Sequence, residues 1–355
     1  MSKAKMILRL KSITLCSLLM CFLSAANGSA PPDSTSEPEK IATAADTLPT
    51  STTISAAGKV YRFGDNREFI YEKPKLYQFL FHAPKDFYIN FSGAFIKENL
   101  WKVGAIAAAT GILVAYDQPI VDEAKDMGRR LNLSSKEGLT SYFDFAGMSM
   151  RGPTDLGSAI FFIGDGWTHA TIAASFLGYG LTSNNHRALQ TASQLLEGFL
   201  TTGLTVQFLK HISGRETPNR ASAPGGAWKL FPHPSQYSKN QPKYGAYPSG
   251  HLATSMMTVT VIAGNYPDQK YIRPLGYTLM TLLAFQMMNN GVHWASDYPL
   301  GIALGYTFGK IAVRRGRTEV KENHSSRQRN QPTSLVLIPI LLEENGIGVR
   351  VQYSF

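Results

Sequence analysis

The stretch that decides the fold is YPSGHLATSMMTVTVIAG, residues 247–264, in which a turn with one histidine opens a long apolar segment. Pro248 and Ser249 are typical of a helix start, with Ser249 as the N-cap, and Gly250 allows another group to approach the backbone closely. The N-terminus of a helix has unpaired N–H groups and a positive dipole end, which attract anions. The sequence therefore predicts a helix over residues 249–265, whose first turn is either an anion site or an ordinary capped end.

Five further segments have the length and apolar character of buried helices. They cover residues 100–116, 155–181, 187–213, 271–290 and 294–315. The chain has 355 residues, of which 44% are hydrophobic, so it is long enough to bury a large core. We therefore expect an all-α fold, a bundle of about six helices in one domain over residues 61–315. A loop of more than thirty residues, 214–248, interrupts the helices, and a loop of that length is usually functional.

The N-terminus has the pattern of a secretory signal peptide over residues 1–26. Four cationic residues precede the apolar run SITLCSLLMCFLSAANGSA, residues 12–30, which ends in small side chains. Both cysteines, Cys16 and Cys21, lie inside this segment, so the exported chain is expected to have no disulfide. The formal net charge of +10 falls when the segment is removed, and the modest positive excess that remains favours anionic substrates or an anionic membrane surface.

Two polar segments flank the expected helical domain. Residues 27–60 are rich in Ser, Thr and Pro, which predicts a disordered tether, and residues 316–333 form a basic linker. Residues 334–355 follow, SLVLIPILLEENGIGVRVQYSF, in which an apolar run and an alternating run surround a turn at 344–346. This pattern predicts a C-terminal β-hairpin. We expect the hairpin to pack on the helical domain, and the alternative is a fragment of a β-barrel wall.

Three polar clusters fall at helix ends. Lys210 ends one helix in FLKHISGRETP, residues 208–218; the PSGH turn begins the next; and GVHWASDYPLG, residues 291–301, carries His293 and Asp297. The last two residues are four apart, so they share one helix face within hydrogen-bonding reach. A carboxylate there holds the imidazole in one tautomer and leaves its other nitrogen free to attack. Each cluster alone is compatible with a structural role, but together they supply what a phosphate site needs.

The order of these motifs resembles the phosphatidic acid phosphatase type 2 and vanadium haloperoxidase superfamily, as a bacterial, exported member. The resemblance covers a motif core over residues 152–310 and implies a helical-bundle fold. It also implies a role for each matching residue. His293 is the expected nucleophile, which forms a phosphohistidine, and Asp297 orients it. His251 is expected to protonate the leaving group.

The same resemblance assigns the phosphate-binding residues. Ser249 and the Gly250 N–H are expected to hold phosphate oxygens, and Lys210 to neutralise phosphate charge. The family motifs carry two arginines where this chain has Thr217 and Met287, so a replacement cation is needed. A charge-assisted contact to an oxyanion contributes about 1.5–3 kcal/mol. Arg215, near Lys210 in the sequence, is the expected phosphate-binding replacement, and the alternatives are other cations of the same loop, Arg220, Lys229 and Lys243.

The predicted function is a phosphatase that acts on a lipid-linked or small phosphate monoester, or on a pyrophosphate. One alternative is a catalytically weak envelope protein that binds on the same fold. Another is a vanadate-dependent haloperoxidase, the only case in which a cofactor, vanadate, is expected. No metal site and no nucleic-acid partner are expected. The predicted location is outside the cytoplasm, in the periplasm or associated with a membrane of the cell envelope.

Overall fold

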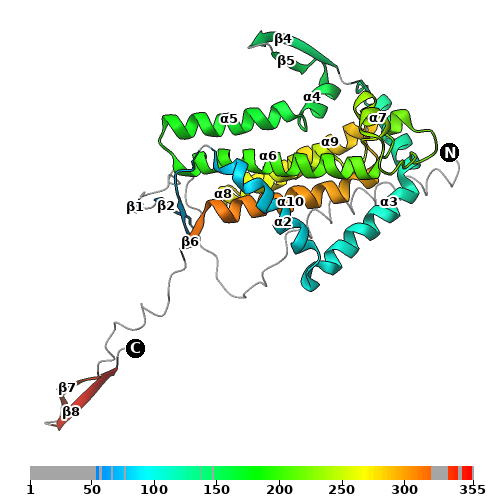
Figure 1. The fold of residues 1–355 in the computed structure, drawn as a ribbon. Helices are drawn as coiled ribbons and strands as arrows, with labels where there is room; N and C mark the ends of the chain where they lie inside the picture. Colours follow the sequence, from blue (N-terminus) through cyan, green and yellow to red (C-terminus); the bar gives the residue numbers. More distant parts are fainter. Residues whose placement is uncertain are drawn as a thin grey trace.

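The fold is mostly helical, as the sequence predicts. The computed structural model describes residues 53–55, 58–64, 67–75, 77–136, 138–145, 148–320, 335–342 and 346–353. Nine α-helices lie within these residues (Figure 1). The predicted signal peptide, both cysteines, and most of the expected tether and linker lie outside the described residues.

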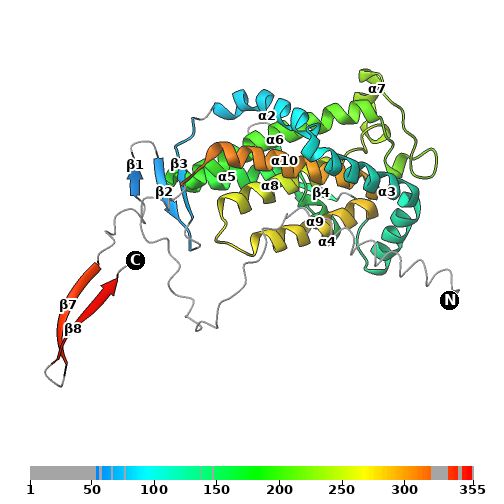
Figure 2. The same ribbon diagram turned by 90° about the horizontal axis from the view of Figure 1, so that it is seen from below.

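The described part of the chain has nine α-helices where about six were expected: α6, α8, α9 and α10 lie close to predicted segments, and α2 and α7 fall outside all of them. In chain order they are α2 Gln78–Ala94, α3 Lys97–Arg130, α4 Leu156–Phe162, α5 Gly166–Thr182, α6 His186–Ser213, α7 Pro234–Lys239, α8 Gly250–Asn265, α9 Ile272–Asn289 and α10 Tyr298–Gly316. Helices α6, α8 and α10 pack on one another, α9 packs on α8, and α2 lies along α6 (Figures 1 and 2).

Two expected helices differ in extent. The helix predicted over 155–181 is divided into α4 and α5, because the Asp165 carboxylate accepts from the N–H of Trp167 at 2.8 Å and starts a new helix. Gly164 lies at the break, where a Cβ would stand only 3.0 Å from the Cβ of His251. The helix expected to stop at residue 116 continues as α3 to Arg130, with Pro119 inside it. Asp117, the first residue after the expected helix, lies inside α3 and is fully buried.

Short strands occupy parts of the expected tether and linker, which corrects both boundaries. Strands β1 Thr53–Ser55, β2 Gly58–Arg62, β3 Glu68–Tyr71 and β6 Thr318–Val320 form an antiparallel sheet in the order β1-β2-β3-β6. The sheet is stable in this otherwise polar region because four aromatic side chains form a buried cluster on it, Tyr61, Phe63, Phe69 and Tyr71. It lies where α6 begins, since the Tyr61 hydroxyl is 3.1 Å from Oδ1 of Asn185.

Two strand pairs complete the described chain. β4 Leu139–Phe145 and β5 Met148–Pro153 form an antiparallel pair before α4, which the sequence reading did not foresee. β7 Leu335–Leu342 and β8 Gly346–Tyr353 form the hairpin expected at the C-terminus, with Leu335 opposite Tyr353. The predicted strands and their antiparallel pairing are therefore present.

A glycine stripe on α10 sets the distance between α8 and α10. Gly301, Gly305 and Gly309 are spaced four apart, so they lie on one face of the helix. A Cβ at Gly305 would stand 2.0 Å from the carbonyl oxygen of Ala253, and one at Gly301 would stand 2.6 Å from that of Ser249. The backbones of the two helices are thus in contact, which brings the start of α8 against the start of α10.

Gly305→Ala is expected to destabilise the fold by about 3 kcal/mol, because the added methyl group must push α8 away from α10. Gly178→Ala is the matched control, since Gly178 lies inside α5 and a Cβ at this position would have nothing within 4 Å. That change is expected to raise stability by up to about 1 kcal/mol through helix propensity. Thermal unfolding of both variants followed by circular dichroism measures the difference, and equal effects would contradict the close-packing argument.

Candidate active site

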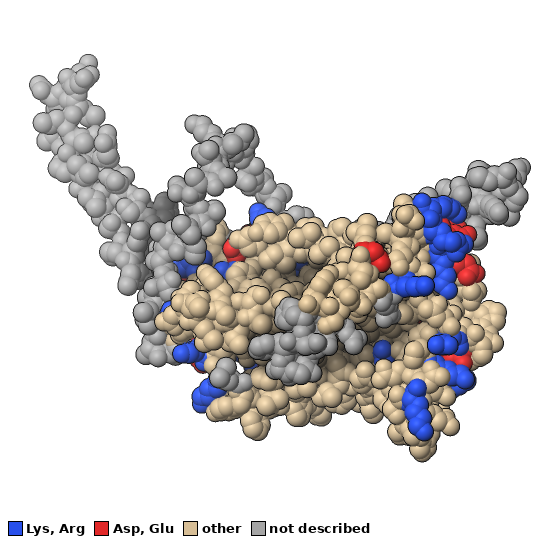
Figure 3. Space-filling model, turned by 90° about the horizontal axis from the view of Figure 1, so that it is seen from above, with Lys and Arg blue, Asp and Glu red and all other residues tan. Residues whose placement is uncertain are grey.

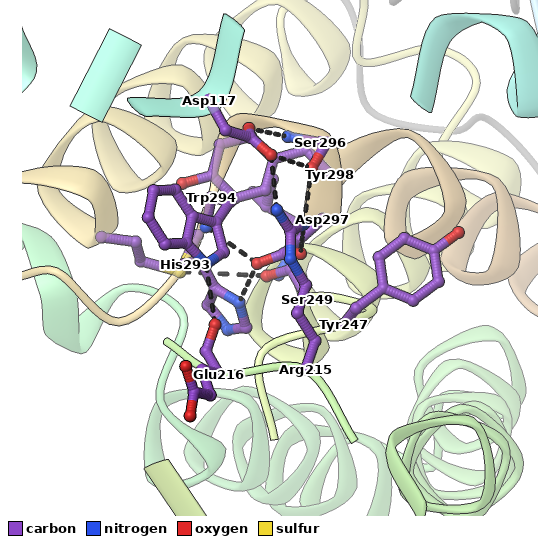
Figure 4. A network of polar contacts seen from close by, with 12 residues as sticks. Asp117, Arg215, Glu216, Tyr247, Ser249, His293, Trp294, Ser296, Asp297 and Tyr298 are labelled. Carbon is purple, nitrogen blue, oxygen red and sulfur yellow. Dashed lines mark hydrogen bonds and ion pairs between the residues drawn. The ribbon is translucent and has the colours of Figure 1, made fainter. Parts of the chain in front are cut away.

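Three helix ends converge at the end of the bundle opposite the β1-β2-β3-β6 sheet. They are the C-terminus of α6 with Lys210, the start of α8 with the PSGH turn, and the loop before α10 with His293 and Asp297. The backbone N–H of Ser249 donates to the carbonyl of Asp297 at 2.9 Å, so two of these motifs are joined directly. The structure therefore brings together residues that are up to 87 positions apart in the sequence. Figure 4 shows the polar contacts around Asp297.

His293 and Asp297 form the pair expected from their spacing. Nδ1 of His293 lies 3.2 Å from Oδ2 of Asp297, and both side chains are buried. The same Oδ2 accepts from the N–H of Trp294 at 2.8 Å, which fixes the carboxylate relative to the loop. Burial lowers the pKa of His293, opposed by hydrogen bonds to Asp297 and to the carbonyl of Ala246. The imidazole is therefore neutral near pH 7, as a nucleophile requires.

His251 faces His293 from the first turn of α8. Their ring centroids are 6.0 Å apart in an edge-on arrangement, and the other face of His251 packs near Phe161. Burial, and to a lesser degree the neighbouring His293 and Lys210, lowers the pKa of His251 to about 3. A bound phosphate brings negative charge that acts in the opposite direction and raises this pKa. The two imidazoles thus face each other between the start of α8 and the loop before α10.

Lys210 lies over the N-terminus of α8. A Cβ at Gly250 would stand 4.0 Å from its Nζ, which places the ammonium beside the unpaired N–H groups of the first turn. Burial lowers the pKa of Lys210 to about 8, opposed by the attraction of Asp297. Lys210, Gly250 and His251 are each only partly buried, so this is the side from which the site is open. A cation and a helix N-terminus together form an anion site there.

Ser249 is fully buried and caps α8. Its hydroxyl accepts from the N–H of Leu252 at 3.4 Å and lies 3.9 Å from the sulfur of Met287. Met287 occupies one of the two positions at which the family motifs carry arginine, so an apolar thioether stands beside this serine. At the other arginine position, the backbone of Thr217 donates to the carbonyl of Pro242. Neither position supplies a cation.

Arg215 does not line the anion site, which corrects its expected role. Its side chain is fully buried, and its guanidinium binds the carboxylates of Asp117 and Asp297 at 2.5 and 2.7 Å. The ring centroids of Trp228 and Trp294 lie 4.6 and 5.4 Å from Cζ of Arg215. Its charge is therefore used by two carboxylates inside the protein. Lys229, another cation of the same loop, is paired with Glu216 at 2.8 Å.

Two residues that contact Arg215 were not among the predicted site residues, Asp117 and Ser296. The backbone N–H of Ser296 donates to Oδ1 of Asp117 at 3.0 Å, and its hydroxyl to Oδ2 at 2.5 Å (Figure 4). Asp117 belongs to α3, far from every motif in the sequence. The one sequence signal for Asp117 was its place directly after a long apolar run. Burial of a carboxylate there has a large desolvation cost unless the carboxylate has hydrogen-bonding or ion-pair partners.

The described residues contain no group of three or more His, Cys, Asp or Glu side chains arranged to hold a metal ion. The titratable side chains that the three helix ends bring together carry imidazole, carboxylate and ammonium groups. These are the groups of the residues expected from the sequence, Lys210, His251, His293 and Asp297.

Comparison with known proteins supports the class that the motifs indicate. Residues 191–321 match the family model of the PAP2 superfamily, which confirms the resemblance for the part of the chain that holds Lys210, the PSGH turn and the His293–Asp297 loop. Among solved structures, the chain is similar to the first transmembrane PAP2 type phosphatidylglycerolphosphate phosphatase from Bacillus subtilis. The identity is 16% and the TM-score 0.32, with coverage of 65% of this chain and 94% of that chain. No curated protein sequence matches the chain.

The pKa of Lys210 predicts the alkaline side of the pH dependence. Below about pH 8 the ammonium is charged and attracts phosphate, and above it the charge is lost. Because kcat/KM reports the free enzyme, kcat/KM for a phosphate ester is expected to fall as pH rises through about 8. Lys210→Arg keeps its charge at all these pH values, so its alkaline decrease should move up by more than one pH unit. An unchanged alkaline limb in Lys210→Arg would show that another group controls it.

Proposed function

We propose that the protein is a phosphatase that hydrolyses a phosphate monoester or a pyrophosphate through a phosphohistidine. The observation that carries the proposal is the arrangement of His293, fixed by Asp297, opposite His251 and beside Lys210 at a helix N-terminus. This arrangement provides a nucleophile, a proton donor and an anion site within one opening. The match to the PAP2 superfamily supports the same class of reaction.

In the first step, Nε2 of His293 attacks phosphorus, and the bond from phosphorus to the leaving oxygen breaks. His251 gives its proton to that oxygen, so the alcohol or phosphate leaves in its protonated form. The charge that develops on the phosphoryl oxygens is stabilised by Lys210 and the N–H groups at the start of α8. Asp297 balances the positive charge that the His293 ring acquires.

In the second step, a water molecule attacks the phosphohistidine, and the bond from Nε2 to phosphorus breaks. His251, now neutral, takes a proton from the water. In the free protein His251 is neutral at pH 7 because its pKa is about 3, so the proton for the first step must come with the substrate or be held by its negative charge. A phosphate ester that binds as the monoanion supplies such a proton.

A catalytically weak binding protein is the second candidate. The observation that favours it is the lack of a cation at Thr217 and Met287, which leaves Lys210 to neutralise the phosphate. A haloperoxidase would hold vanadate in the same place, and vanadate is also a multiply charged oxyanion. Turnover of a phosphate ester by the purified protein excludes the catalytically weak binding protein. Bromination that depends on added vanadate would favour the haloperoxidase.

We further propose that the substrate lies in or on a membrane. The described residues contain one helix, Lys97–Arg130, that is long and apolar enough to cross a membrane by length and composition. Many large apolar side chains of α2, α3 and α6 are exposed, among them Phe81, Tyr88, Phe91, Trp101, Leu204 and Phe208. Figure 3 views the molecule from the side of α5, and on this face too most lysines and arginines gather at the two ends of the helical body and leave the middle largely uncharged. Such a surface fits lipid better than water.

Exposed apolar side chains also lie next to the site. Trp228, Leu230 and Phe231 are exposed, and the N–H of Phe231 donates to the carbonyl of Ile212 at the end of α6, two residues from Lys210. A lipid surface in contact with these side chains would present phosphate groups to Lys210. This position supports a lipid-linked phosphate over a small soluble one.

His293→Ala is expected to lower kcat for a phosphate monoester by at least about 10³-fold, because it removes the proposed nucleophile. A rapid acid-free quench with ³²P-labelled substrate should trap a phosphoenzyme in the wild type and none in this variant. His251→Ala is the informative comparison. With an ester of a good leaving group, which needs no proton donor, it should still form the phosphoenzyme and then accumulate it. Phosphoenzyme in His293→Ala would contradict the assignment.

Phe91→Glu with Phe208→Glu is expected to reduce flotation of the protein with vesicles of phosphatidylglycerol and phosphatidylcholine, because both charges would enter the lipid. Leu156→Glu is the control, since this exposed residue lies in the first turn of α4, where a carboxylate is tolerated. Equal flotation of all three proteins would contradict the membrane surface. We propose from the predicted signal peptide that the mature chain lies in the cell envelope, and N-terminal sequencing that starts at Met1 would contradict removal of the peptide.

A further inference from the structure

We propose that Asp117 and Arg215 form a positioning pair that holds Asp297, and through Asp297 the nucleophile His293. The three charged side chains make a buried chain of carboxylate, guanidinium and carboxylate that ends at the imidazole. Asp117 lies on α3, before the segment that matches the PAP2 superfamily, so this part of the site is contributed by a helix outside the matched domain. The inference rests on the proposed function only for its effect on turnover.

The contacts divide the two oxygens of Asp297 between two tasks. Oδ1 accepts from Nη1 of Arg215 at 2.7 Å, and Oδ2 faces His293 Nδ1 at 3.2 Å (Figure 4). The carboxylate is thereby held in the plane that points Oδ2 at the ring. Arg215 is the only one of these partners that binds Oδ1, so its position decides the angle at which the carboxylate meets the imidazole.

Asp117 in turn fixes Arg215 and the loop together. Its Oδ2 accepts from Nη2 of Arg215 at 2.5 Å, while its two oxygens accept from the N–H and hydroxyl of Ser296, the residue beside Asp297. Nη1 of Arg215 also donates to the Ser296 hydroxyl at 2.6 Å. Asp117 thus binds both the arginine and the backbone that carries Asp297. Its side chain, like those of Arg215 and Asp297, is fully buried.

The pair also adjusts the charge that His293 experiences. One guanidinium lies between two carboxylates, so the buried chain carries one excess negative charge if all three groups are ionised. Without Asp117, the charge of Arg215 would act on Asp297 alone and weaken the pull of Asp297 on the imidazole proton. The other charged or titratable groups that face His293 are Lys210 of α6, His251 of α8 and Tyr298 of α10. Asp117 is not among the charges that shift the pKa of Lys210 or His251, whereas its charge helps to raise the pKa of Tyr298, so Tyr298 is the one of the three that its removal also affects.

The test compares Asp117→Asn with Glu216→Gln. Glu216 is a matched control because its carboxylate is also buried and ion-paired, in the same loop as Arg215, but its contacts go to Lys229, Ser222 and Ala227 and not to Asp297. Asp117→Asn is expected to lower kcat about 10–100-fold with little change in KM, because the groups that bind phosphate remain. Its acid limb of kcat/KM should move to lower pH, since His293 holds its proton less strongly. Glu216→Gln is expected to change neither.

A second measurement does not depend on turnover. The pKa and tautomer of His293 are followed by NMR of the full-length protein with ¹⁵N-labelled histidine, and the signal is assigned by its loss in His293→Gln. Asp117→Asn is expected to lower this pKa and to reduce the share of the Nδ1–H tautomer, and Arg215→Lys, which cannot bind both carboxylates in a fork, to change the tautomer as well. This result supports the positioning pair even if the protein hydrolyses no phosphate ester.

The opposite results overturn the inference. A His293 signal in Asp117→Asn that titrates as in the wild type shows that the pair does not act on the imidazole. If Glu216→Gln loses as much kcat as Asp117→Asn, and the two variants have the same lowered melting temperature, the role of Asp117 is in stability alone. Failure of the proposed function is distinct from both, because it appears as absent turnover in the wild type with the NMR differences intact.

Discussion

The contact between the backbones of α8 and α10 is the constraint on which the site depends. A helix pair normally lies 8–10 Å apart because side chains separate the axes. Gly301 and Gly305 of α10 have no side chains, so the carbonyl groups of Ser249 and Ala253 of α8 pack directly against the α10 backbone. The N-terminus of α8 therefore reaches the loop before α10, and the N–H of Ser249 binds the carbonyl of Asp297. Each half of the site is fixed by the other.

Charge is distributed unevenly between the surface and the interior of this site. On the open side, a phosphate meets one lysine and one helix N-terminus. In the buried interior next to the site, the guanidinium of Arg215 is ion-paired with the carboxylates of Asp117 and Asp297. Arg215 thus contacts the carboxylate that holds the proposed nucleophile and does not line the proposed phosphate site, while Met287 leaves the position beside Ser249 apolar. A substrate that carries less charge, or that supplies its own proton, is better matched to such a site than a fully ionised phosphate.

Much of the site was predictable from the sequence, because its signals are local. The four-residue spacing of His293 and Asp297 predicted their contact, although the pair lies in the loop and the 3-10 turn Ala295–Asp297 before α10 and not on the face of an α-helix. The PSGH turn marks a helix start by its residue types alone. The predicted phosphate-binding role of Arg215 was wrong for a physical reason. The sequence shows that this cation is near the anion site, but it does not show which carboxylates lie closer to the guanidinium than the site does. Asp117 is 98 residues from Arg215 and 179 from Ser296, so no local pattern links them. The sheet β1-β2-β3-β6 was not predicted, because its stability comes from an aromatic cluster whose residues come together only in the folded chain.

Helix α3 connects the two environments of the protein. Tyr116 is half exposed on the apolar outer side, while the next residue, Asp117, is fully buried against Arg215 and Ser296. Neighbouring positions on a helix differ by about 100° in direction, so one helix can present an apolar outer face and reach the site at once. The buried ion pair prevents α3 from turning about its axis, because rotation would expose Asp117 to the apolar side at a large desolvation cost. The orientation of the apolar surface and the orientation of the nucleophile are therefore set by the same carboxylate.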